Sequence, residues 1–418
     1  MALAVALFAA LVLGFTAFSA GFGRAFLTAP ILFLVAGAAV GRIEAFASID
    51  RAVIQTIAEV TLALLLFHDA SQLQPRELRA DAPLTGRLLL VGLPLTIAAG
   101  YLVARLLFPE IGVWPALLLA AALAPTDAGL GAATVLNPVV PVRIRRVLNV
   151  ESGLNDGLAT PVVLFAVAAA AGLSDGATAH TVAEALLEIA VGAAVGAAAG
   201  FLSGRLLDAA HDRGWSQQDL VPVAVLVVPM LSYYAAHGAG GNGFIAAFTA
   251  GTMFALAQVD LDRMHATLEL TDQVAALLGF AVWMLFGTAI ATHFGAILSP
   301  VPLAFAVLSL TVLRMVPVAL CLLGSGLRAP SVLFIGWFGP RGLASVVFAL
   351  IALESLDGSP GADKTVGVIA STVLLSVLAH GYTATPWARR YGAWASGPAH
   401  PAVETQQTVA PRRTSSRA

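Results

Sequence analysis

Hydrophobic residues fall into runs of about 20 positions, separated by short stretches with prolines, glycines and charged residues. A run of that length forms an α-helix that can cross the ~30 Å hydrocarbon core of a bilayer. Turn residues and charges divide the chain into about thirteen such runs. The predicted spans cover residues 2–21, 25–41, 52–69, 87–107, 113–136, 147–172, 182–207, 219–237, 242–258, 273–293, 301–324, 332–354 and 366–385.

The composition supports this pattern. Of the 418 residues, 59% are hydrophobic and 11% charged, and the mean hydropathy is +0.88. Soluble domains carry about 25% charged residues, so the chain is predicted to be an all-α polytopic membrane protein. The first run lacks a positively charged leader region, so we interpret it as a retained span and not as a signal peptide. The single cysteine, Cys321, excludes an internal disulfide.

The basic residues predict the orientation of the spans. There are 22 of them, and 21 are arginine. With the C-terminus in the cytoplasm, thirteen alternating spans place 16 on the cytoplasmic side and four on the other, which follows the positive-inside rule. The N-terminus is then outside. The last two, Arg314 and Arg341, lie within spans. The abundance of arginine and alanine is typical of bacteria, which favours a bacterial plasma membrane.

Two regions are expected. Residues 1–390 are predicted to form the transmembrane domain. Residues 391–418 lack apolar periodicity and are rich in Pro, Ser, Thr and Ala, so we predict a disordered, inert cytoplasmic tail. The net charge of −2 says little about partners other than the lipid bilayer, and no nucleic acid is expected.

Two of the spans are interrupted. The fifth, LLLAAALAPTDAGLGAATVL, is broken at Pro125, and the twelfth, VLFIGWFGPRGLASVVFAL, is broken by glycines and a proline around Arg341. They lie seven spans apart and therefore cross the membrane in opposite directions. Two oppositely oriented broken helices are typical of inverted-repeat secondary transporters, whose site lies where the breaks meet. The alternative, that proline merely kinks two packed helices, explains one break more easily than two.

A polar stretch, LNVESGLNDGLATPVVLF, begins the sixth span. On a helix, Ser152 and Asp156 lie four residues apart on one face, and Glu151 and Asn155 form the adjacent stripe. A hard cation such as Na⁺ prefers oxygen ligands, which Asp156 and Ser152 supply. The broken backbone near Thr126 adds unpaired carbonyl oxygens.

The same carboxylate also offers a place for a proton. A protonated Asp156 has no charge with which to hold Na⁺, and a cation-bound Asp156 has no vacancy for H⁺. Competition for one acidic group is enough to couple the two fluxes. Soft metals fit poorly, because no cysteine or histidine lies nearby in the sequence.

The other ionisable residues near the spans are costly to insert, so each needs a partner or a purpose. We expect Glu151 to form a buried ion pair with Arg314 or Arg341. Asp127 is a candidate ligand, relay or helix cap. Asp69 either contributes to the ion path or faces water at the membrane edge.

Two further expectations concern side chains beside these groups. Asn155 can both donate and accept, so it suits orienting Asp156 or capping the broken segment. His68, next to Asp69, is expected to be solvated.

Other kinds of chemistry have no sequence support. We find no GxxxxGK[ST] loop, no HExxH motif and no GxSxG elbow, so we expect neither an enzyme nor a resident cofactor. Transport without a nucleotide site must be driven by an ion gradient. A passive cation channel is an alternative, but no filter motif is present. A scaffold without transport would leave the intramembrane charges without a purpose.

Three segments carry a resemblance to a known family. LAPTDAGLGAATV, VESGLNDG and GPRGLASVVFAL resemble signatures of the monovalent cation:proton antiporters that include NhaP and the animal sodium/proton exchangers. The resemblance covers roughly residues 1–390. It implies an inverted-repeat antiporter fold with two crossed interrupted helices, a homodimer with interleaved core and dimerisation subdomains, and an elevator-like motion.

The resemblance also implies the site residues. It places ion and proton at Asp156, with Ser152, Thr126 and a third-span carboxylate, for which Asp69 is the candidate, as further ligands. It also implies that arginines like Arg314 and Arg341 stabilise the core, and that one of them forms an ion pair with Glu151. The family often has a larger residue at the position of Gly153. The predicted activity is an exchange of Na⁺, or of Li⁺ or K⁺, for H⁺, electroneutral at 1:1; a K⁺-selective antiporter is the alternative.

Overall fold

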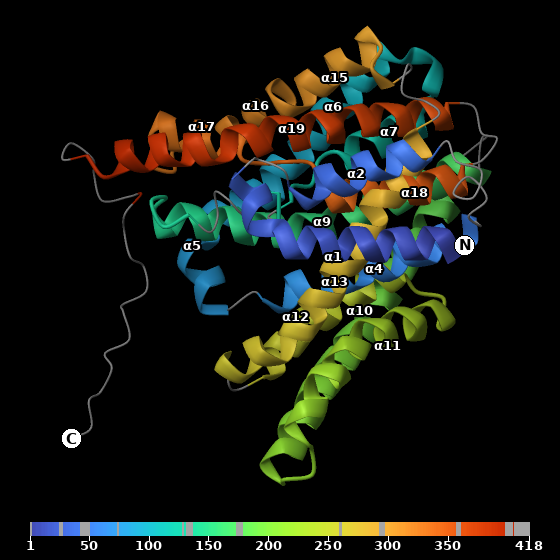
Figure 1. Cartoon of the computed structure of the whole chain (residues 1–418), viewed down its shortest axis with the longest axis vertical. Coiled ribbons are helices and arrows are strands. Elements are labelled where there is room, and N and C mark those ends of the chain that lie inside the picture. Colours follow the sequence, from blue (N-terminus) through green and yellow to red (C-terminus); the bar gives the residue numbers. More distant parts are fainter. Residues whose placement is uncertain are drawn as a thin grey trace.

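A computed structural model of the chain is shown in Figure 1. It describes residues 2–24, 28–41, 51–72, 75–127, 129–130, 137–172, 179–258, 261–291, 297–356, 361–397 and 404. All regular structure among these residues is helical. The elements are α1 (Ala2–Arg24), α2 (Ala29–Val40), α4 (Arg51–Ser71), α5 (Pro75–Arg87), η1 (Leu88–Gly92), α6 (Leu93–Leu107), η2 (Pro109–Ile111), α7 (Val113–Ala122), α9 (Val142–Gly172), α10 (Ala179–Asp212), η3 (Gln218–Leu220), α11 (Val221–Gly238), α12 (Gly243–Ala257), α13 (Leu261–Ile290), α15 (Pro300–Leu310), α16 (Val312–Cys321), α17 (Ala329–Trp337), α18 (Leu343–Ser355) and α19 (Ala362–Ala395).

The predicted all-α polytopic architecture is confirmed. In the part of the chain that the structure describes, eight helical segments are long and apolar enough to cross a membrane, and five shorter helices are also apolar. Every predicted span coincides with one or more of these helices. Several extend beyond the predicted limits: α13 begins at Leu261, and α19 runs through 34 residues.

Two differences from the predicted spans concern irregular backbone. The eleventh span is divided at Thr311, whose φ of −111° and ψ of −92° separate α15 from α16. Helix α5, between the third and fourth spans, was not predicted. It is amphipathic and contains a kink at the buried Asp81, which pairs with Arg143 and Arg146 at the start of α9.

The two predicted interruptions are present. Helix α7 ends at Ala122, and the chain continues without helical structure through Asp127; residues 128 and 131–136 of the predicted fifth span lie outside the described residues. In the twelfth span, α17 ends at Trp337 and α18 begins at Leu343. The breaks touch, because the Asp127 N–H donates to the carbonyl of Pro340 at 2.9 Å.

The main apolar core lies around these breaks. It joins α7, α9, α13, α18 and α19, with contributions from α2 and α4. In Figure 1, α10 and α11 extend away from the layer that holds α15, α16, α17 and α19. Helix α10 approaches α12 closely through a glycine stripe. A Cβ at Gly196 would lie 2.2 Å from the Ala246 oxygen, so only glycine permits this approach.

The boundary of the predicted tail needs one correction. Helix α19 continues to Ala395, because its apolar and aromatic positions Tyr391 and Ala395 remain buried after residue 390. Beyond it, Glu404 is buried and accepts hydrogen bonds from the Arg328 N–H and the Ser331 hydroxyl. Residues 398–403 and 405–418 lie outside the described residues, so the predicted disorder stays a prediction.

Candidate ion-binding site

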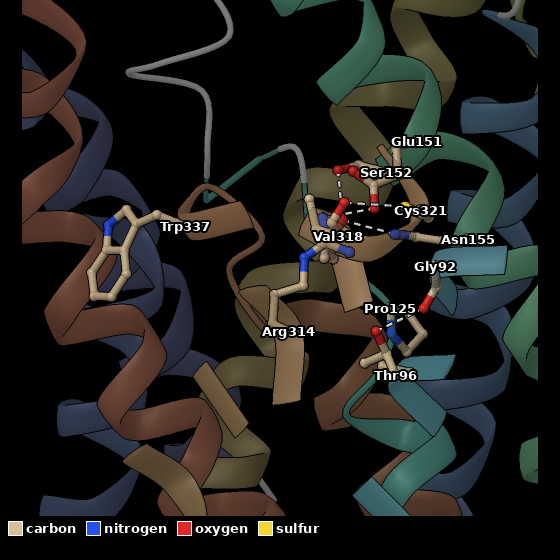
Figure 2. Close-up of polar contacts among 12 residues, drawn as sticks. Gly92, Thr96, Pro125, Glu151, Ser152, Asn155, Arg314, Val318, Cys321 and Trp337 are labelled. Carbon is tan, nitrogen blue, oxygen red and sulfur yellow. Dashed lines mark hydrogen bonds and ion pairs between the residues drawn. The ribbon is translucent and has the colours of Figure 1, made fainter. Parts of the chain in front are cut away.

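Helix α9 presents its polar stretch to the break after α7. The hydroxyl oxygens of Thr126 and Ser152 lie 2.9 Å apart, and Asn155 Nδ2 donates to Thr126 Oγ1 at 2.7 Å. All three side chains are buried. Ser152 and Asn155 project from the same helix toward the broken segment (Figure 2). Asn155 therefore contacts a side chain of the break, whereas its Oδ1, the atom that would cap backbone N–H groups, has no hydrogen-bond partner among the described residues. Its two predicted roles, orienting Asp156 and capping the broken segment, stay predictions.

Asp156 lies one turn after Ser152. Its side chain is buried, and Oδ1 has no hydrogen-bond partner in the described part of the chain. It lines a cavity of about 550 Å³, together with Ser152, Thr126, Asp127 and Asp69. A buried carboxylate oxygen without a donor is costly, so this position calls for a cation or a proton.

Asp69 reaches the same cavity from α4. Its helix contacts α9 at Gly153, where a Cβ would lie 3.6 Å from the Asp69 Cβ, an ordinary packing distance. The half-buried Asp69 therefore lies on the wall of the cavity. Whether it contributes to the ion path or faces water at the membrane edge stays a prediction.

Beside Asp69, sequence reasoning placed His68 wrongly and did not consider Asp272 as a site residue. His68 is buried, not solvated as predicted, because it packs between Gln72 and Asp272. Its Nε2 lies 3.4 Å from Asp272 Oδ1. Asp272 itself is largely exposed and also lines the cavity. In the sequence Asp272 is only a charge near the start of a span, and nothing there connects α13 with α4.

Asp127 caps a helix. Its Oδ2 accepts the N–H of Leu343, the first residue of α18, at 2.8 Å, and its Oδ1 accepts the Leu130 N–H at 3.1 Å. A carboxylate at a helix N-terminus satisfies orphan donors and is favoured by the helix dipole. Of the three roles considered for Asp127, these contacts fit the cap; its place in the cavity wall leaves the others open.

Glu151 pairs with an arginine and does not line the cavity that Asp156 lines. Its Oε1 forms an ion pair with Arg314 Nη2 at 2.7 Å, and both side chains are almost fully buried. The pair lies beside the Ser152 and Asn155 contacts in Figure 2. Gly339 makes room for Arg314, because a Cβ there would lie 2.7 Å from Arg314 Nε. The sequence left two arginines open as the partner of Glu151, and the ion pair is with Arg314.

Arg341 contacts backbone instead. Its Nη1 donates to the carbonyl oxygens of Ala124 at 2.9 Å and of Pro125 at 3.0 Å. An arginine in the break of the twelfth span thus donates to carbonyl oxygens in the break of the fifth span, which have no partners within a helix. Among the described residues, no group of three or more His, Cys, Asp or Glu side chains is placed to hold a metal ion tightly. The carboxylates of Asp156, Asp127 and Asp69 line the cavity without forming such a group, beside the hydroxyls of Ser152 and Thr126.

Comparison with known proteins agrees with this geometry. Residues 4–390 match the family model described as sodium/hydrogen exchanger, transmembrane. The structure is also similar to that of the sodium proton antiporter MjNhaP1 from Methanocaldococcus jannaschii at pH 8, with a TM-score of 0.72, 17% identity, and coverage of 94% of this chain and 98% of that chain. An electron-microscopy structure of MjNhaP1 matches with a TM-score of 0.74, 18% identity, and coverage of 96% and 99%. The fold is therefore that of these antiporters, as the resemblance of the three signature segments implied.

Proposed function

Because the chain belongs to the sodium/hydrogen exchanger family, as its signature segments predicted, we propose that it exchanges Na⁺ for H⁺ at Asp156. One observation carries the proposal. Asp156 Oδ1 is a buried acceptor without a partner among the described residues, on the wall of a cavity beside the Ser152 and Thr126 hydroxyls. A dehydrated monovalent cation needs such oxygen ligands, and a proton needs the same carboxylate.

The coupling follows from this single group. When Asp156 is ionised it attracts the cation, and when it is protonated the attraction is gone, so the two ions exclude each other. One titratable group at this position gives one proton per cation, which makes the exchange electroneutral. Ser152 and Thr126 act as neutral ligands, and Asn155 holds Thr126 in place. Asp69 is a further ligand or a step on the path to the site.

The wider mechanism is alternating access of this site to the two sides of the membrane. With the N-terminus outside and the C-terminus in the cytoplasm of a bacterial cell, Asp69 and Asp272 line the cytoplasmic side of the cavity. The interrupted helices and α9 form the moving core, which slides against a dimerisation subdomain in a homodimer. Transport needs no nucleotide and no resident cofactor in this scheme.

The experiment that tests the proposal uses the full chain in everted membrane vesicles. A pH gradient is imposed, and its dissipation is followed by a fluorescent pH probe after addition of Na⁺, Li⁺ or K⁺. We expect Asp156→Asn to abolish the response, because the amide can neither bind a proton nor balance a cation. Asp219→Asn, on the exposed η3, is the matched control and should respond normally.

Three results would contradict the proposal. Undiminished exchange by Asp156→Asn would remove the proposed site. If an imposed pH gradient never drives the cation against the cation's own concentration gradient, the protein is a passive channel. A response to K⁺ alone would support the K⁺-selective alternative over Na⁺ exchange.

A further inference from the structure

Helix α19 places a buried serine and a buried histidine against the break of the twelfth span. Ser376 and His380 lie four residues apart and are 0% and 1% exposed. The Arg341 N–H, inside the break, donates to Ser376 Oγ at 2.6 Å. His380 Nε2 lies 2.9 Å from the carbonyl oxygen of Trp337, the last residue of α17. The two side chains therefore contact the break at its start and in its middle.

His380 contacts Ser376 through one ring nitrogen and Trp337 through the other. Its Nδ1 lies 3.2 Å from the Ser376 hydroxyl and 2.9 Å from the Ser376 backbone carbonyl oxygen, and its Nε2 faces the Trp337 carbonyl. The Ser376 hydroxyl oxygen accepts the Arg341 N–H. The imidazole therefore lies beside the hydroxyl that receives Arg341 and helps to hold it in place.

The chain of contacts leads on to the ion site. The guanidinium of Arg341 holds the carbonyls of Ala124 and Pro125, which directly precede Thr126. Thr126 in turn contacts Ser152, one turn before Asp156. A shift of the Arg341 backbone would therefore move the segment that carries a neutral ligand of the cation.

From this geometry we propose that Ser376 and His380 are positioning residues for cation binding, acting through Arg341 on the backbone that carries Thr126. The proposal rests on the function proposed above. Neither side chain touches the ion. Sequence reasoning did not single them out, although a histidine inside a span carries the same insertion cost that drew attention to the arginines.

Helix α19 also supplies a matched control. Thr383 accepts a hydrogen bond from Trp337 Nε1 at 3.0 Å, so it links α19 to α17 without touching the backbone of the break. The Trp337 side chain points away from Glu151 and Ser152 (Figure 2). Loss of the Thr383 hydroxyl weakens the packing of the same two helices and leaves the contacts of Arg341 intact.

The experiment measures Na⁺-driven proton exchange by the full chain in proteoliposomes, as a function of Na⁺ concentration. For Ser376→Ala we expect the half-saturating Na⁺ concentration to rise about tenfold, because a buried N–H loses its acceptor. We expect the maximal rate to change much less. Thr383→Val should leave the half-saturating concentration near that of the wild type.

Conservative variants at His380 sharpen the test. Asn places its side-chain amide near the position of Nδ1 and can keep a contact with Ser376, whereas Gln places its amide near Nε2 and can only replace the contact with Trp337. We therefore expect His380→Asn to keep more of the cation affinity than His380→Gln. Size-exclusion profiles in detergent verify folding, and Ser376→Ala decides the test if a His380 variant does not fold.

The outcomes separate this inference from the function it rests on. Wild-type affinity in Ser376→Ala, or an equal loss in Thr383→Val, would overturn the positioning role while leaving the exchange activity established. Reduced maximal rates with unchanged half-saturation would also overturn it. If the wild-type protein itself shows no exchange, the proposed function fails first.

Discussion

Replacing Glu151 by glutamine removes the counter-charge of a guanidinium that has almost no contact with water. The side chains of Arg314 and Glu151 are 2% and 3% exposed, and their atoms approach to 2.7 Å. Removing one member of a buried pair leaves an uncompensated buried charge and costs about 3–5 kcal/mol. That corresponds to roughly two to four orders of magnitude in the unfolding equilibrium.

The measurement is equilibrium unfolding in mixed detergent micelles, followed by tryptophan fluorescence. Glu151→Asp keeps the charge and is expected to be destabilised much less than Glu151→Gln. The double variant Glu151→Gln with Arg314→Met removes both charges and keeps most of the side-chain volume. Because apolar replacement of a whole buried pair is often neutral, it should recover most of the lost stability.

Two results would refute this reasoning. A loss below about 1 kcal/mol for Glu151→Gln is the magnitude of an exposed pair and would mean that water reaches Arg314. A double variant that is no more stable than Glu151→Gln would mean that the lost stability did not come from the unpaired charge.

Two further predictions concern other parts of the core. Gly342→Ala should abolish exchange and lower the melting temperature, because the added Cβ would lie 1.8 Å from Asp127 Oδ2. Gly367→Ala is the control: its added Cβ would meet no atom within 4 Å, so exchange and melting temperature should stay near the wild type. In η2, a hydrogen bond from Lys364 holds the pKa of the exposed Glu110 carboxyl below its usual range. Its small stabilisation is present above the usual value of about 4.5 and is lost as the pH falls through the lowered value, so Glu110→Gln and wild type should converge in acid unfolding curves.

Much of the fold follows from local properties of the sequence. The length of the apolar runs predicts the spans, because a helix must satisfy its own backbone in lipid. The prolines and glycines around Arg341 predict the second break, since they cannot continue a helix. The extension of α19 to Ala395 was missed because hydropathy falls where aromatic residues such as Tyr391 are buried against protein rather than lipid.

The site was predictable only in part. The four-residue spacing of Ser152 and Asp156 placed both on one face of a helix, and the structure brings that face to the cavity. The spacing did not reveal which helices lie opposite. The contacts of Asp127 with α18 and of His68 with Asp272 join segments far apart in the chain. A single sequence carries no record of such pairs, so the helix that Asp127 caps and the burial of His68 came only from the structure.

The touching breaks also constrain how the protein is made. Asp127 and Leu343, whose hydrogen bond closes one break against the other, lie 216 residues apart in the chain. During synthesis the fifth span therefore enters the bilayer long before the twelfth exists. Until then the carbonyls of Ala124 and Pro125 lack the guanidinium that holds them in the finished protein. In the nascent chain, water, lipid headgroups or the insertion machinery must supply hydrogen bonds to these two carbonyls. If the ribosome stalls before residue 341, the carbonyls stay without their native partner.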